Sequence, residues 1–205
     1  MKGLLLKDWY MLKSYCRTFL LLVLVYATVS PALGNSSGFT MLLPCVLSGM
    51  ISMTLIAYEE REKWNVYAAT LPVSKAQAVS CKYLVSLIVS STVLCITLLS
   101  HTAAMLARHS FDITAISGLF ITLVPLCLLP TALLLPFIFK LGSEKGRMMY
   151  YAIFVLFGIA VPLLSPENAL RAIGKLTSAV ILAASVLIFG ASWLLSIRFY
   201  QKREL

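Results

Sequence analysis

The sequence predicts an all-α membrane protein with six transmembrane helices, an N-terminal interfacial amphipathic helix and a cytoplasmic helix between spans 2 and 3. Of its 205 residues, 60% are hydrophobic and only 12% are charged, whereas about 25% charged residues is usual in soluble domains. The apolar residues form runs of roughly 20 residues, the length that crosses a hydrocarbon core about 30 Å thick. The basic residues concentrate on one side of the resulting topology, which is typical of membrane proteins.

Residues 1–17 are predicted to form an amphipathic helix that lies in the membrane interface. Trp9 falls on its apolar arc, while Lys7 and Lys13 fall on the opposite arc toward lipid headgroups. Asp8 breaks the pattern because it lies on the apolar side. The n-region of a signal peptide is the alternative interpretation of this segment.

Six apolar spans follow and make up one transmembrane domain over residues 18–197, with a cytoplasmic tail at 198–205. The first and fifth spans are short, and none of the connections is long enough to fold separately. The expected spans are Thr18–Leu33, Phe39–Tyr58, Tyr83–Leu106, Ile113–Phe139, Met149–Leu164 and Leu176–Ile197.

The distribution of charge predicts the orientation. With the N-terminus inside, fourteen of the 17 basic residues are cytoplasmic and three are outside. Both termini and the polar segment at about 59–82 are therefore expected in the cytoplasm. The net charge of +9 then indicates an anionic membrane surface as the partner, not nucleic acid.

The segment at about 59–82 is predicted to contain a short helix and the start of a second one. One helical face carries four apolar residues at spacings i, i+3, i+4 and i+7: Trp64, Tyr67, Ala68 and Leu71. Pro72 ends this helix. Ser74 and Gln77 form a capping-box pattern that starts a new helix continuing into the third span.

The third and fourth spans carry the remaining candidate features. One face of the third span is polar and serves either helix packing or a translocation surface: Ser86, Ser90, Thr97 and His101. The fourth span contains Pro125, Pro130 and Pro136, so we expect a kinked or broken helix. These prolines are hinge candidates, with ordinary tolerated kinks as the alternative.

No catalytic or metal site is expected in this chain. The sequence has no G-x-x-x-x-G-K-[ST] motif for ATP, and its five cysteines and two histidines are not spaced as metal ligands. Glu59-Glu60-Arg61 differs from the EExxxR motif of membrane-embedded proteases. We therefore expect no enzyme activity and no cofactor here.

Two segments resemble the ABC type-2 permease family, whose members match this chain in length and six-span layout. They are Leu5-Leu6-Lys7-Asp8-Trp9 near the N-terminus, and Glu59-Glu60, Lys63-Trp64, Tyr67, Leu71-Pro72-Val73-Ser74-Lys75 and Lys82-Tyr83-Leu84 around the polar segment. The resemblance implies a membrane subunit of a bacterial ATP-binding cassette exporter in the plasma membrane. ATP and Mg would bind a separate P-loop ATPase, and a second permease copy or paralogue would complete a dimer. Relatives of this size export amphipathic peptides, such as phenol-soluble modulins, so a peptide or another hydrophobic solute is the implied substrate.

The resemblance also implies roles for individual residues. The polar segment would hold the coupling helix that docks on the ATPase, through Glu59, Glu60, Arg61, Lys63, Trp64, Tyr67, Leu71 and Ser74. Asp8 and Trp9 would belong to the interfacial elbow helix. Two alternatives stay open: a solvated loop with an aromatic anchor, and a non-transporting immunity or sensory protein without an ATPase.

Overall fold

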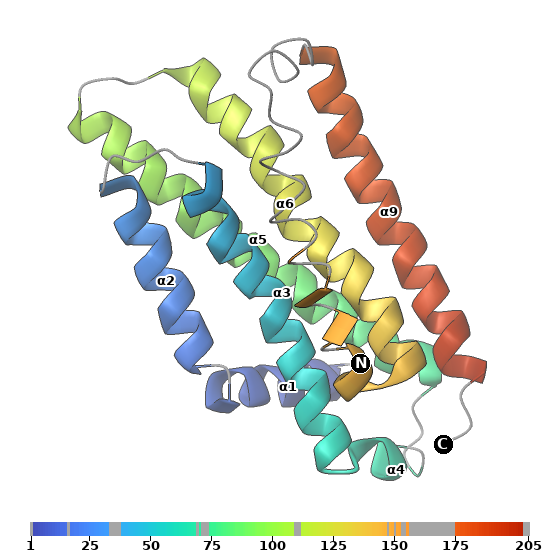
Figure 1. The fold of residues 1–205 in the computed structure, drawn as a ribbon. Coiled ribbons are helices and arrows are strands. Elements are labelled where there is room, and N and C mark those ends of the chain that lie inside the picture. Colours follow the sequence, from blue (N-terminus) through green and yellow to red (C-terminus); the bar gives the residue numbers. More distant parts are fainter. Residues whose placement is uncertain are drawn as a thin grey trace.

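The computed structural model describes residues 2–15, 17–32, 38–68, 70, 74–108, 112–146, 148–149, 151–152, 155 and 175–202. The main elements in these residues are helices, which confirms the expected all-α class (Figure 1). They are α1 (Lys2–Tyr15), α2 (Arg17–Ala32), α3 (Gly38–Arg61), α4 (Trp64–Ala68), α5 (Lys75–Ala107), α6 (Ile113–Leu141) and α9 (Lys175–Lys202).

Five of these helices coincide with expected spans, namely α2, α3, α5, α6 and α9. Among the described residues, three helices are long and apolar enough to cross a membrane: Lys75–Ala107, Ile116–Leu141 and Val180–Lys202. The expected fifth span, Met149–Leu164, falls almost entirely outside the described residues. The described residues thus contain three candidate membrane-spanning helices, while the total of six spans stays a prediction.

α1 lies across one end of the bundle, where α6 and α9 also end (Figure 1). The rings of Phe139 and Tyr200 are 5.5 Å apart there, and the Lys75 Nζ donates to the Gln201 carbonyl at 3.5 Å. Because α6 and α9 run in the same direction, the chain returns to the opposite end between them. This geometry agrees with termini on one side of the membrane, although which side stays a prediction.

α5 is the helix around which the others pack, since it contacts α1, α2, α3, α6 and α9. Its 33 residues extend about 50 Å, well beyond a hydrocarbon core of about 30 Å. The expected capping box begins it: the Ser74 Oγ accepts from the Gln77 amide at 3.2 Å, and the Gln77 Oε1 accepts from the Ser74 amide at 3.3 Å. The polar segment therefore continues directly into a spanning helix.

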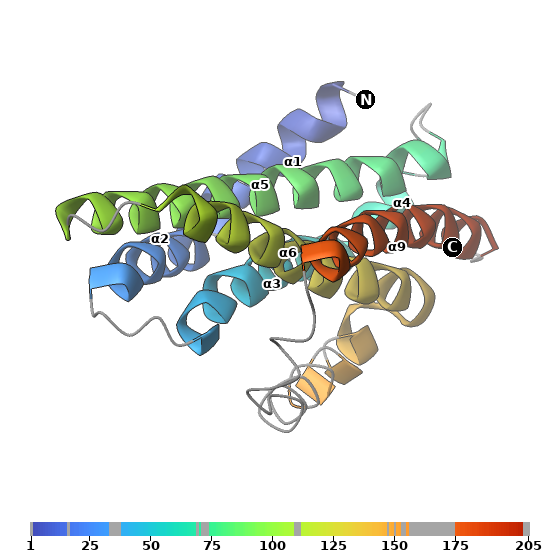
Figure 2. The same ribbon diagram turned by 90° about the horizontal axis from the view of Figure 1, so that it is seen from above.

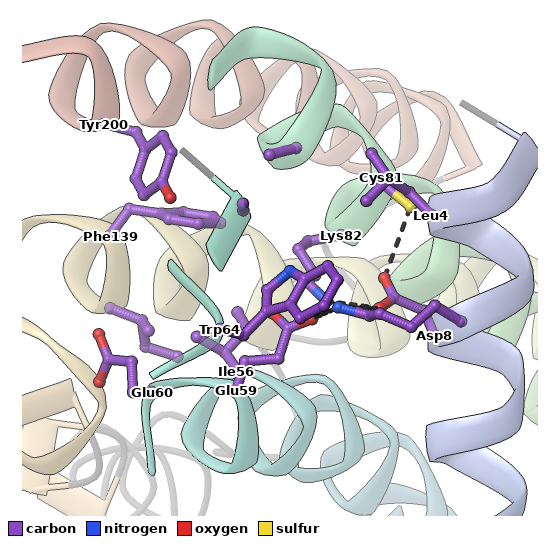
Figure 3. A pocket seen from close by; sticks show the side chains of 14 residues that line it. Leu4, Asp8, Ile56, Glu59, Glu60, Trp64, Cys81, Lys82, Phe139 and Tyr200 are labelled. Carbon is purple, nitrogen blue, oxygen red and sulfur yellow. Dashed lines mark hydrogen bonds and ion pairs between the residues drawn. The ribbon is translucent and has the colours of Figure 1, made fainter. Parts of the chain in front are cut away.

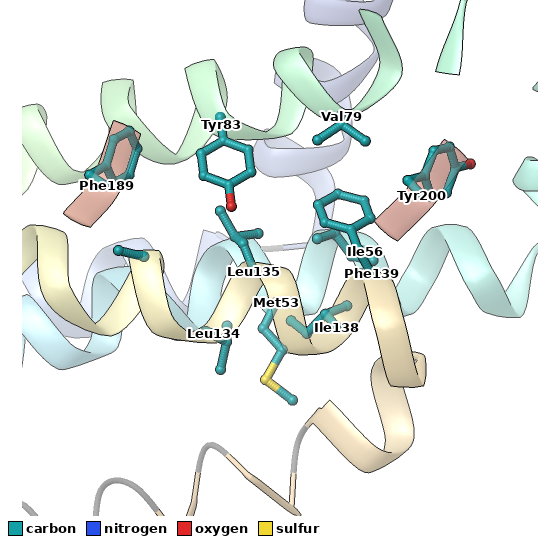
Figure 4. Packing of buried hydrophobic residues seen from close by; sticks show 11 residues of the cluster. Met53, Ile56, Val79, Tyr83, Leu134, Leu135, Ile138, Phe139, Phe189 and Tyr200 are labelled. Atoms are coloured by element: carbon teal, nitrogen blue, oxygen red, sulfur yellow. The ribbon is translucent and has the colours of Figure 1, made fainter. Parts of the chain in front are cut away.

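Two buried clusters of apolar side chains form the core. One joins α3, α5, α6 and α9 and contains Met53, Val79, Tyr83, Leu135 and Phe189 (Figure 4). The second joins α1 and α2 to α3 and α5. Since α3 and α5 contribute to both clusters, they connect the N-terminal helices to the rest of the bundle.

The fourth span was expected to be kinked or broken; α6 is one α-helix from Ile113 to Leu141 with its three prolines inside, so it is not broken, and a kink stays a prediction. Pro136 has no amide hydrogen, so the carbonyl of Ala132, four residues earlier, lacks its helical partner. The Ser192 Oγ of α9 donates to this carbonyl at 2.5 Å. A neighbouring helix thus satisfies the freed carbonyl, which lets the helix continue.

Candidate functional site

Four charged side chains from three helices meet where α1 crosses the start of α5 (Figure 3). The Lys82 Nζ lies 2.7 Å from the Asp8 Oδ1 and 2.6 Å from the Glu59 Oε1. Lys7 pairs with the same two carboxylates, contacting the Asp8 Oδ1 at 3.3 Å and donating to Glu59. We call Lys7, Asp8, Glu59 and Lys82 the charge cluster.

Local structure explains why these residues meet. Asp8 lies on the side of α1 that packs on the bundle and is only 1% exposed. Lys82 comes about two turns after the Ser74 cap, and Glu59 lies in the last turn of α3. The two cations balance the two carboxylates, so no net charge is buried. Removing one partner from such a group costs about 3–5 kcal/mol, because an uncompensated buried charge remains.

The short helix α4 adjoins the charge cluster through Trp64. The Lys7 Nζ lies 4.0 Å from the centroid of the Trp64 ring, a cation–π contact. The Trp64 and Tyr67 rings pack at 5.2 Å, but Tyr67 is 57% exposed. Tyr67 is therefore the exposed aromatic side chain of α4, whereas Trp64 contacts the chain's own N-terminal helix.

A tight turn joins α3 to α4. Lys63 adopts φ 52°, the left-handed conformation that costs non-glycine residues about 1–2 kcal/mol. Its amide donates to the Glu60 carbonyl at 3.2 Å. The Glu60 Oε2 in turn accepts the Ser143 amide at 2.7 Å, so the short helical segment at residues 143–146 is attached to the last turn of α3.

Tyr83 attaches the start of α5 to α9. Its ring stacks on Trp193 at 5.5 Å, and its hydroxyl lies 2.8 Å from the Ser192 Oγ and 2.6 Å from the Ser196 Oγ. Ser192 uses its only proton on the Ala132 carbonyl, so Tyr83 donates to Ser192 and Ser196 donates to Tyr83. This chain of hydrogen bonds links α5, α9 and α6.

The space beside the charge cluster is too small for a transported solute. This cavity measures about 40 Å³ and is lined by Leu4, Trp64, Cys81 and the charge cluster, among others. Ligand pockets usually measure about 300–1,000 Å³, while a single water needs about 10–15 Å³. Among the described residues, no three His, Cys, Asp or Glu side chains are grouped to hold a metal ion. The arrangement is a joint between helices and has no substrate pocket.

The structure distributes the predicted docking residues between buried and exposed positions. It brings Asp8, Glu59 and Trp64 together, and it leaves Arg61 and Lys63 exposed. Trp9 of α1 is 55% exposed and does not line the cavity beside the charge cluster. Leu71 lies outside the described residues. Ser74 caps α5, and the structure assigns it no further contact with the charge cluster.

The polar face of α5 is buried inside the bundle, which favours the packing interpretation. Its residues are at most 8% exposed: Ser86, Ser90, Thr97 and His101. The hydroxyls of Ser86 and Thr97 donate to carbonyls of their own helix, at 2.8 and 2.7 Å. Within the described part of the chain, the Ser90 Oγ and the His101 Nε2 have no hydrogen-bond partner. The hinge role of Pro125, Pro130 and Pro136 stays a prediction.

Sequence reasoning did not identify Lys7 and Lys82 as site residues, although one signal was visible. Asp8 sits on the apolar arc of an otherwise amphipathic helix, and a buried carboxylate requires a cationic partner. Lys82 is the last charge before a long apolar span, which makes it a candidate partner. Their pairing depends on the crossing of α1 and α5, which the sequence pattern does not specify.

Comparison with known proteins gives one match. Residues 3–201 match the family model described as ABC-2 family transporter protein. No curated protein and no solved structure matches the chain.

Proposed function

The chain belongs to the ABC-2 transporter family as a membrane permease, and from this premise we propose that it receives mechanical work from a separate ATP-binding cassette ATPase. Docking would occur on α4 and on the short helical segment at residues 143–146. The permease would pass the movement of α4 to α5 through the charge cluster. ATP and Mg would bind only the ATPase.

One observation carries this proposal: the charge cluster joins the end of α3, just before α4, to the start of a spanning helix. Glu59, five residues before α4 begins at Trp64, pairs with Lys82 at 2.6 Å. Lys82 is followed at once by Tyr83, which is bonded to α9. A displacement of α4 therefore has a continuous chain of charged and aromatic contacts into the bundle.

The exposed side chains identify the docking surface. Tyr67 is 57% exposed, and exposed aromatic residues are enriched at the energetic centres of protein interfaces. Arg61, Glu62 and Lys63 are exposed beside it and would form a polar rim. We expect Tyr67 to anchor the ATPase directly and Trp64 to act by holding α4 against Lys7.

The test is co-purification with the neighbouring ATPase, together with its stimulated ATPase rate. We expect Tyr67→Ala to weaken co-purification by at least about tenfold, the effect of an interface anchor. Phe120→Ala is the matched control, because Phe120 is a 45% exposed aromatic on α6, away from α4. Equal binding by Tyr67→Ala and the wild type would contradict the docking assignment.

A second variant separates docking from transmission. Lys82→Met leaves the surface of α4 intact, so we expect the ATPase still to bind while its rate no longer responds to the permease. Loss of binding and stimulation together in folded Lys82→Met would contradict the role of the charge cluster in transmission.

Export, and an amphipathic peptide or hydrophobic solute as substrate, remain expectations from the resemblance. Dimerisation with a second permease copy or paralogue likewise belongs to the proposal. A transport assay in vesicles that contain both subunits tests export, with a catalytically inactive ATPase as the control.

A further inference from the structure

An apolar groove separate from the charge cluster lies in the angle between α1 and α5. Its volume is about 320 Å³, within the usual range for small-molecule sites of about 300–1,000 Å³. From α1 it is lined by Leu5, Leu6, Trp9 and Leu12. Seen from above, the first half of α1 extends past α5 on the side opposite α3 (Figure 2), so the angle between the two helices is open to the surroundings.

The other wall of the groove lies along α5. Val85, Ile88 and Val89 line it, and they follow Lys82 by one to two turns toward the middle of the apolar span. Val85 and Val89 are buried, while Ile88 is 45% exposed at the rim. The groove therefore runs from the interfacial helix into the depth of the bilayer, the course that an acyl chain follows.

An exposed cation, Lys13, lies on α1 within one to two turns of the residues that line this groove. Leu6, Trp9 and Lys13 are spaced i, i+3 and i+7, so Lys13 lies beside Leu6 and Trp9 at the boundary between the apolar and basic arcs of α1. Lys13 is exposed and forms no ion pair among the described residues, unlike Lys7. A lysine stem lies along apolar surface while its ammonium stays at the headgroup level, and Trp rings favour the same level.

We propose that this groove binds one acyl chain of an anionic phospholipid, whose phosphate pairs with Lys13. The apolar walls supply affinity for the chain, and the Lys13 ammonium supplies preference for an anionic headgroup. The bound lipid would sit against α1, the helix that carries Asp8 into the charge cluster. This site does not depend on the ATPase, so it is testable on the permease alone.

The test is native mass spectrometry of the detergent-purified permease after exposure to phosphatidylglycerol or phosphatidylcholine. We expect one retained phosphatidylglycerol per chain, with phosphatidylcholine retained less. Ile88→Trp, which fills the rim, should remove both adducts. Leu87→Trp is the matched control, because Leu87 is the adjacent residue, 39% exposed, and does not line the groove.

The charge is tested separately. Lys13→Gln should lower phosphatidylglycerol retention by about fivefold, as one interfacial cation predicts, and leave phosphatidylcholine unchanged. Lys202→Gln, an exposed lysine at the end of α9, is the control. Leu6→Trp, at a position 58% exposed, gives a second groove variant should Ile88→Trp fail to fold.

Three results would overturn the proposal. The first is that Ile88→Trp and Leu6→Trp retain as much lipid as Leu87→Trp. The second is equal retention of the two lipids by the wild type. The third is a change of oligomeric state in the groove variants without any lipid adduct, since that result would assign the groove to a second copy of the chain.

Discussion

Ser192 supplies the hydrogen bond that Pro136 cannot make. The Ser192 Oγ of α9 lies 2.5 Å from the carbonyl of Ala132, the group whose helical partner would be the amide of residue 136. Both ends of this bond are buried. A proline in a spanning helix and a serine 56 positions later therefore form one structural unit.

A double-mutant cycle tests this unit. Ser192→Ala leaves the Ala132 carbonyl unsatisfied, and we expect a loss of about 1–2 kcal/mol in stability. In a Pro136→Ala background, the amide of residue 136 can donate to the Ala132 carbonyl. Ser192→Ala should therefore reduce stability less in that background. Thermal unfolding in detergent measures both differences. Equal costs in the two backgrounds would contradict the pairing.

The charge cluster gives the largest expected effect on stability. Lys82→Met leaves Asp8 and Glu59 sharing only Lys7, so one buried negative charge is uncompensated and about 3–5 kcal/mol is lost. Adding Asp8→Asn rebalances the charge and should recover much of that loss. Thermal unfolding with Lys202→Met as the exposed control measures these effects. A Lys82→Met protein as stable as the control would show that this cation is not needed.

The close approach of Gly146 to α6 predicts a steric effect. A Cβ at Gly146 would lie 2.7 Å from the Ile138 Cγ1, and Ile138 is fully buried and cannot move aside. We expect Gly146→Ala to cost about 1–3 kcal/mol. Gly118→Ala is the control, because a Cβ at Gly118 meets nothing within 4 Å; it should be neutral or stabilising in a helix. Matching unfolding temperatures for the two variants would refute the contact.

The left-handed backbone of Lys63 predicts that glycine is better than alanine there. Lys63→Gly relieves about 1–2 kcal/mol of strain, offset by about 0.4–1 kcal/mol of unfolded-chain entropy, so a net gain in stability of up to about 1.6 kcal/mol is expected. Lys63→Ala keeps the strain and should give no gain. Thermal unfolding of Lys63→Gly and Lys63→Ala measures the two stabilities. An equal gain in stability from both variants would show that the left-handed φ of residue 63 is not the cause of the gain.

Local patterns predicted much of the helical structure. Apolar runs predicted the positions of α2, α3, α5, α6 and α9, and Ser74 with Gln77 predicted the start of α5. These features depend on residues within one or two helical turns, so a single segment contains the information for them. The prolines predicted a kinked or broken helix, and α6 is not broken; the sequence pattern could not show this because Ser192, which compensates for Pro136, belongs to a distant helix.

The sequence singled out the segments that form the charge cluster but not the pairings within it. The polar segment was visible as such, and Asp8 was visible as an exception on an apolar arc. Trp64 and Tyr67 were both expected to anchor a partner, which stays a prediction; the Trp64 ring lies over Lys7, and Tyr67 is the more exposed of the two. Whether a side chain faces a partner or its own chain depends on how helices cross, and helical periodicity contains no information on crossing.

The sequence by itself determined that this is a helical membrane protein, where most of its helices lie, and that α5 begins at a cap outside its apolar span. Composition and short-range spacing are sufficient for those features, because burial in lipid and helical hydrogen bonding are local requirements. Only the tertiary structure decided that Asp8, Glu59 and Lys82 are partners, that Ser192 completes the helix at Pro136, and that a groove remains between α1 and α5. These features join residues far apart in the chain, and their energies depend on distances that exist only once the helices have packed.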